Sequence, residues 1–102
     1  MIPRRRSRFD ELVRRQLDLF VEDEAELLDE AEEAERAYDD APREDAEEAY
    51  GDYQTILDAV ADALSERRAT YAATLDADAA EEYERTFDAV AGKRFPLLRG
   101  RL

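Results

Sequence analysis

The sequence predicts an all-α protein: a long antiparallel helical hairpin with a shorter third helix, completed to a helical bundle by dimerisation. Three observations lead to this prediction. Apolar residues recur every three or four positions over long stretches, which is helical spacing and not strand alternation. Gly and Pro number only three each, too few for the many turns of a β fold. Charged residues reach 42%, above the roughly 25% of an average soluble domain, so each helix has a charged face. The 102 residues predict one domain, 1–102.

The first predicted helix covers residues 7–39. From Phe9 to Tyr38 the chain holds no Gly or Pro. Apolar residues recur there at helical spacing and form a stripe, which is interrupted once, at Glu24, where an acid stands in place of an apolar residue. Ser7 is placed to cap this helix with its hydroxyl. The basic residues 1–6 before it are expected to be extended and mobile. Acidic residues four positions apart crowd the second half of the helix and repel one another by a few tenths of a kcal/mol per pair, so packing must stabilise it.

The second predicted helix covers residues 42–74. Pro42 excludes Ala41 from the helical region and suits the first position of a new helix. Because the connection is short, we expect the two helices to fold back as an antiparallel hairpin. Each has just over thirty residues, or roughly 50 Å at the helical rise.

The third predicted helix covers residues 79–91. Asp78 and Glu81 have the spacing of a capping box, and Gly92 is expected to end the helix. Lys93 and Arg94 follow at its negative end. Residues 95–102 form an apolar and basic tail, which we expect to dock on the hairpin or on a protein partner.

The charge of the chain is unevenly distributed. The formal net charge is −13. Residues 1–15 hold six Arg and two acids, and residues 93–102 hold four bases and no acid. Residues 22–48, called the acidic segment below, hold fifteen acids and two Arg. A strongly acidic chain is repelled by nucleic acid and by anionic membranes, so we expect no nucleic-acid partner.

Several classes of protein are disfavoured by what the sequence lacks. The chain has no Cys and no His, which removes disulfides, thiol chemistry, the usual general base and most zinc sites. No stretch approaches the ~20 apolar residues of a membrane span, and no signal peptide is recognisable. We expect a cytoplasmic protein.

Two acidic motifs resemble parts of known metal sites. Glu32-x-x-Glu35 resembles the first half of the paired-acid motif of all-α nucleotide pyrophosphohydrolases, but the Glu-x-x-Asp of the second half is missing. Asp76-Ala-Asp78 resembles the opening of a calcium loop but lacks its later ligands and its Gly, so we interpret it as helix capping. We predict no catalytic, cofactor-binding or metal-ligating residue.

The favoured function is therefore a non-enzymatic structural or adaptor module that acts through helix–helix contacts, working as a homodimer. Two alternatives remain: a small carboxylate–metal hydrolase resembling the pyrophosphohydrolases, and an acidic decoy of a nucleic-acid-binding protein. Pairs of adjacent apolar residues make the apolar face of each helix wider than contact with one partner helix requires. The additional apolar surface predicts a protein interface. The predicted interface residues are Leu27, Leu28, Ile56, Leu57, Phe95, Leu97 and Leu98.

Overall fold

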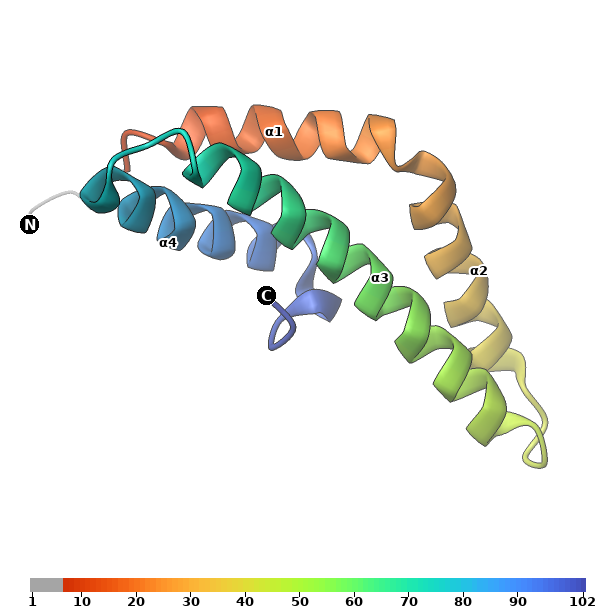
Figure 1. Ribbon diagram of the computed structural model, residues 1–102. Coiled ribbons are helices and arrows are strands. Elements are labelled where there is room, and N and C mark those ends of the chain that lie inside the picture. Colours follow the sequence, from red (N-terminus) through yellow and green to blue (C-terminus); the bar gives the residue numbers. More distant parts are fainter. Residues whose placement is uncertain (1–6) are drawn as a thin grey trace, which may run out of the picture.

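The computed structural model describes residues 7–102 as helices joined by short connections (Figure 1). The elements are α1 (Asp10–Asp23), α2 (Ala25–Asp40), α3 (Ala46–Ala72), α4 (Ala77–Arg94) and the short 3₁₀ helix η1 (Pro96–Leu98). No strand occurs in this range, so the predicted all-α class is confirmed. The segment 1–6, expected to be mobile, lies outside the described residues.

The run predicted as one helix over 7–39 is two helices. The helical backbone is interrupted at Glu24, which has φ −108° and ψ 28°, and this is the position where the apolar stripe misses its step. After the bend, α2 follows α3, whereas α1 packs mainly against α4 (Figure 1). The interruption thus allows the two halves of the stripe to face different partner helices.

The connection between α2 and α3 begins as the proline predicts. Ala41 is extended, with φ −64° and ψ 134°, because Pro42 excludes it from the helical region. Pro42 does not open the next helix, however. Its carbonyl accepts a hydrogen bond from the Asp45 N–H at 2.9 Å in a turn, and α3 starts only at Ala46.

Helix α4 is longer at both ends than the predicted 79–91. Asp76 is its N-cap, and the Asp76 carboxylate accepts the Ala79 N–H at 2.9 Å, so Asp78 is not the capping residue. The helix continues through Gly92 to Arg94. Gly92 instead lies against the tail: its carbonyl accepts a hydrogen bond from Arg99 Nε at 2.9 Å, and a Cβ at Gly92 would be 3.7 Å from Arg99 Cγ.

The hydrophobic core lies where α1, α3, α4 and the tail meet. Its fully buried side chains are Tyr83, Phe20, Phe87, Leu17, Leu64, Leu98, Val13 and Val60. The start of α1 is tied to α4 by polar groups: Thr86 Oγ1 donates to Ser7 Oγ at 2.7 Å, and Ser7 Oγ donates to Glu82 Oε2 at 3.1 Å. The Ser7 hydroxyl also accepts the Phe9 N–H at 3.2 Å.

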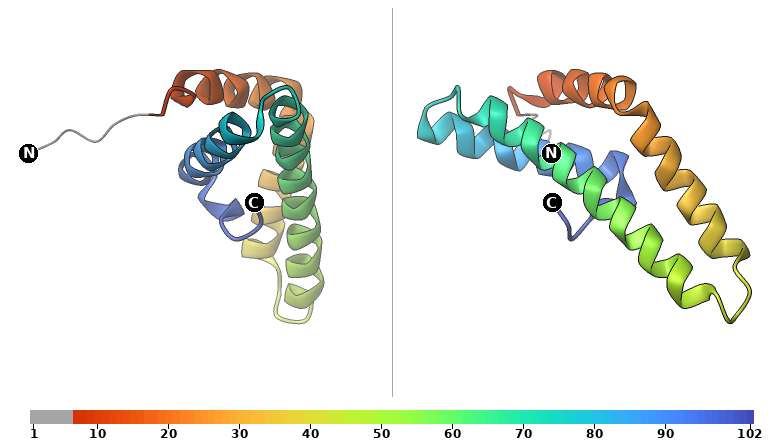
Figure 2. Two further views of the ribbon diagram at one scale, coloured as in Figure 1. Left: turned by 60° about the vertical axis from the view of Figure 1, so that its left-hand side comes forward. Right: turned by 45° about the vertical axis from the view of Figure 1, so that its right-hand side comes forward.

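The described chain is elongated. Its extents are 51 × 35 × 21 Å and its radius of gyration is 16.2 Å, against about 13 Å for a compact domain of this length. The cause is visible in Figure 2, where α2 and the first half of α3 extend away from α4. No residue of α2 is fully buried. Within residues 7–102, no helix combines the length and the apolar character needed to cross a membrane.

Candidate interaction surface

The seven predicted interface residues differ in their exposure. Leu57 and Leu98 are buried in the core, with 6% and 2% of their surface exposed. Leu97 is the most exposed of the seven, at 56%. The other four are half-buried; they are Leu27, Leu28, Ile56 and Phe95.

A groove brings five of these seven residues together. It has a volume of about 280 Å³ and lies between α2, the middle of α3 and the tail. Its lining residues are Leu28, Ala31, Glu32, Glu35, Tyr53, Leu57, Val60, Arg94, Phe95, Pro96, Leu97 and Leu98. We call it the tail groove. Leu27 and Ile56 do not line it.

The tail wall of this groove is attached to the rest of the chain by packing and by ion pairs. Leu98 is buried in the core, and the Phe95 ring packs edge-on against Phe20 with centroids 6.1 Å apart. Arg101 Nε donates to Asp58 Oδ1 on α3 at 2.9 Å, and Arg101 also hydrogen-bonds Gln54. The tail therefore docks on its own chain, and Leu97 is the one large apolar residue of the tail that stays largely exposed.

The opposite rim of the tail groove is acidic. Glu32 and Glu35 stand one turn apart on α2. Glu35 Oε2 accepts a hydrogen bond from the Tyr53 hydroxyl at 2.9 Å. Burial, which is the largest cause, and this hydrogen bond to a carboxylate together raise the pKa of Tyr53 to about 12. The sequence could not indicate this location of the two acids, because their position beside an apolar groove depends on the docked tail.

The acidic segment around this rim is almost free of ion pairs among the described residues. Of its fifteen acids, only Asp23 pairs with a cation, Arg67, at 2.9 Å. The remaining ion pairs join residues outside the acidic segment; they are Arg8–Glu82, Arg68–Asp88, Arg85–Glu81, Arg94–Asp18 and Arg101–Asp58. A concentrated negative potential therefore covers α2 and the start of α3.

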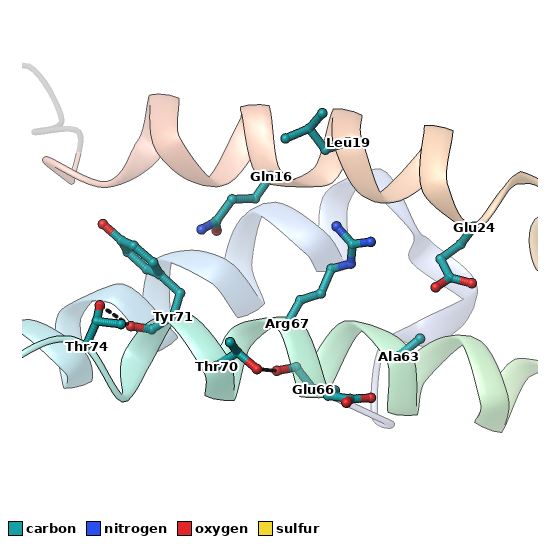
Figure 3. A pocket seen from close by; sticks show the side chains of 9 residues that line it. All are labelled: Gln16, Leu19, Glu24, Ala63, Glu66, Arg67, Thr70, Tyr71 and Thr74. Carbon is teal, nitrogen blue, oxygen red and sulfur yellow. Dashed lines mark hydrogen bonds between the residues drawn. The ribbon is translucent and has the colours of Figure 1, made fainter.

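A second, wider groove lies between α1 and α3, and Figure 3 shows its lining side chains. Its volume is about 570 Å³. Arg67 reaches across it to Asp23 and lies over the Phe20 ring, 5.3 Å from the centroid. The hydroxyls of Thr70 and Thr74 donate to the carbonyls of Glu66 and Tyr71 on α3 at 2.9 and 2.7 Å. Their protons are thus already used, and towards a ligand these hydroxyls can act only as hydrogen-bond acceptors unless these bonds break.

The sequence did not predict this second groove. Its lining is Gln16, Leu19, Glu24, Ala63, Glu66, Arg67, Thr70, Tyr71 and Thr74. The available signal was Leu19, which is 48% exposed and stands off the apolar stripe of α1. A single exposed Leu is common on protein surfaces, so that signal alone could not have located the groove.

The structure also places the two motifs weighed as metal sites. Glu32 and Glu35 lie on the rim of the tail groove, and Asp76 caps α4. Within residues 7–102, no three acidic side chains converge in a way that could hold a metal ion.

Comparison of the chain with protein-family models, with curated proteins and with solved structures gives no match.

Proposed function

We propose that this protein is a non-enzymatic adaptor or structural module that acts through helix–helix contacts and works as a homodimer. The observation that carries the proposal is the incomplete burial of α2. This helix has an apolar stripe along 16 residues, yet none of them is fully buried. Helices in water are stabilised chiefly by packing of their apolar face, and α2 packs mainly on one side, against α3.

The half-buried apolar residues of α2 and α3 supply the surface for a second subunit. Leu27 touches the core only from its edge, and Ile56 on α3 is half-buried and outside the core cluster. Two such helix pairs packed face to face would form a four-helix core, with a twofold axis as the commonest arrangement. The acidic faces would then point outward, where water and salt weaken their mutual repulsion.

The dimer is tested by light scattering coupled to size exclusion at ~0.15 M salt. We expect the mass of two chains for the wild type and of one chain for Ile56→Asp, because a charge cannot be buried unpaired at the interface. Thr55→Asp, an exposed neighbour on the same helix, is the matched control and should remain dimeric. Circular dichroism checks that each variant is helical. A wild-type mass of one chain at every concentration refutes the dimer. Leu27→Asn is a second, milder variant of the same apolar surface.

The acidic decoy is the second candidate, and the observation that favours it is the acidic segment, where fourteen of fifteen acids form no ion pair with any residue of 7–102. Such a surface can occupy a basic, nucleic-acid-binding protein. Displacement of labelled duplex DNA from a basic DNA-binding domain measures this. A decoy should displace the DNA at ~0.15 M salt more efficiently than polyglutamate of equal total charge. Equal efficiency would mean that charge alone acts, and would count against the decoy.

A further inference from the structure

The tail groove carries two carboxylates that have no cationic partner among residues 7–102. Glu32 and Glu35 line the same rim of the groove. Within residues 7–102 neither carboxylate belongs to an ion pair, and Glu35 accepts one hydrogen bond, from Tyr53. Side chains three positions apart on a helix lie about 5–6 Å from one another, so a single guanidinium can reach both.

The floor of the groove between these acids and the tail is apolar. Leu28 and Ala31 of α2 and Val60 of α3 line it, and the tail adds Pro96 and the exposed Leu97. A volume of about 280 Å³ is just under the range typical of small-molecule sites, about 300–1,000 Å³, and suits one or two aliphatic side chains. The groove therefore fits a short segment with aliphatic residues followed by Arg.

The chain itself has such a segment in residues 1–6, which lie outside the described structure. Its sequence is Met-Ile-Pro-Arg-Arg-Arg. Two large apolar residues come first, then Pro, which favours extended backbone, and then three Arg with no acid. Arg binds carboxylates through two parallel hydrogen bonds and is weakly hydrated compared with Lys. Both the charge and the apolar content of this segment are complementary to the tail groove.

The arginines of this segment cannot reach the groove of their own chain. They lie one to three residues before Ser7, at most about 11 Å of backbone. Ser7 is held beside Glu82 and Thr86 on α4, whereas the groove lies past the C-terminal end of α4, at Phe95. The 14 residues of α1, which begins three residues after Ser7, span about 21 Å. Glu32 and Glu35 lie on α2, beyond the far end of α1 (Figure 1), which is farther than this backbone and an Arg side chain can extend.

We propose that residues 1–6 of one copy dock in the tail groove of a second copy, with Met1 and Ile2 on the apolar floor and the arginines on Glu32 and Glu35. The basic end of each molecule then meets the acidic segment of another, which offsets part of the repulsion between two chains of charge −13. A reciprocal exchange gives a closed pair, and a one-way contact gives a head-to-tail chain. This contact uses residues other than the Leu27 and Ile56 faces, so it does not depend on the helix-face dimer.

A mixed-sample paramagnetic experiment tests this contact directly. The sequence has no Cys, so Ala37→Cys, an exposed position on α2, introduces a single site for a spin label. Spin-labelled protein without isotope is mixed with ¹⁵N-labelled wild type. We expect selective broadening of the amide signals of Ile2 and residues 4–6 of the wild-type chain, because only a contact between copies can cause it. Absence of broadening in the mixture would overturn the proposal.

Two charge variants of the spin-labelled copy test the specificity. Glu32→Gln with Glu35→Gln should abolish the broadening. Asp29→Asn with Glu33→Gln removes the same charge from the same helix at exposed positions that do not line the groove, and should retain most of it. Equal loss in both variants would mean nonspecific attraction and would refute docking in the groove. Ile2→Ser in the ¹⁵N-labelled copy should weaken the effect at residues 4–6; unchanged broadening would refute the apolar contact.

Discussion

At the scale of single residues, two buried tyrosines combine apolar packing with a satisfied hydroxyl. Tyr83 is fully buried, contacts the rings of Phe9 and Tyr71, and donates its hydroxyl to Gln16 Oε1 at 2.7 Å. Tyr53 donates to Glu35. Burial raises the pKa of Tyr83 to about 12, although the Gln16 hydrogen bond acts in the opposite direction. The pKa of Tyr53 is also raised to about 12. Both residues are therefore neutral donors at physiological pH.

These raised pKa values predict a loss of stability at high pH. In the unfolded chain a tyrosine titrates at 10.0, but in the folded protein at about 12. Between these values the unfolded state releases its proton first, so the free energy of unfolding falls as the pH rises. The stabilisation is complete below pH 10 and is lost towards pH 12, on the order of 2 kcal/mol per residue. Urea unfolding across this range measures it. The double variant Tyr53→Phe, Tyr83→Phe should lose less stability; an identical loss would contradict the assignment.

The start of α4 allows a test of one capping residue against its neighbour. Asp76 accepts the Ala79 N–H, whereas Asp78 is exposed in the first turn. Asp76→Ala should lower the free energy of unfolding by about 1 kcal/mol, as expected for loss of an N-cap. Asp78→Ala should change it by less than about 0.5 kcal/mol. Thermal or urea unfolding of the two variants distinguishes them, and a larger cost for Asp78→Ala would reverse the assignment.

At the scale of elements, the tail contributes to the stability of the helices although it contains only one short 3₁₀ turn. Leu98 is buried at 2% exposure, while its neighbour Leu97 is 56% exposed. The reversal at Gly100, with φ 90°, brings Arg101 back to Asp58 on α3. The tail thus closes the core at the end of α4.

The two neighbouring leucines give a matched prediction for the tail. Leu98→Ala should lower the free energy of unfolding by about 2–5 kcal/mol, the usual cost of removing a buried Leu side chain. Leu97→Ala should leave it within about 0.5 kcal/mol. The measurement is urea unfolding followed by circular dichroism. Equal effects would mean that the tail is not docked in solution as in the structure.

At the scale of the whole molecule, attraction and repulsion between charges are separated in space. Ion pairs join the elements around the core, such as Arg94–Asp18 between α4 and α1 at 2.6 Å. In the part of the chain that the structure describes, Asp23 is the only acid of the acidic segment that belongs to an ion pair. Exposed ion pairs contribute little, typically 0.2–1 kcal/mol each, whereas the repulsion sums over fourteen neighbouring acids.

The balance of charge predicts that salt stabilises the protein. Between low salt and ~0.5 M NaCl, screening should relieve the repulsion in the acidic segment. We expect the melting temperature to rise by several degrees, because 1 kcal/mol corresponds to about 4–8 °C in a domain of this size. Replacing Glu26, Glu30 and Glu33 by Gln should reduce this rise. A melting temperature that falls with salt would mean that the ion pairs around the core outweigh the repulsion.

Much of the fold was predictable from local patterns. The all-α class follows from the apolar period, and the interruption near Ala41 follows from Pro42. Lys93 and Arg94 lie at the negative end of α4, although inside its last turn and not after it. The groove was not predictable, although five of its lining residues were among the predicted interface residues. Their exposure depends on contacts with residues distant in the sequence: Leu57 and Leu98 are covered by their own chain, and Leu97 is not.

The sequence by itself determined the all-helical class and the separation of charge, because helical period, proline chemistry and composition are local properties. Only the tertiary structure decided the rest. The missed step at Glu24 is compatible with a continuous helix or with a bend, and the bend occurs because α1 packs on α4 while α2 packs on α3. Gly92 can end a helix or make room for a neighbour, and here Arg99 of the docked tail lies against it. Packing between distant segments selects among conformations that are locally comparable in energy.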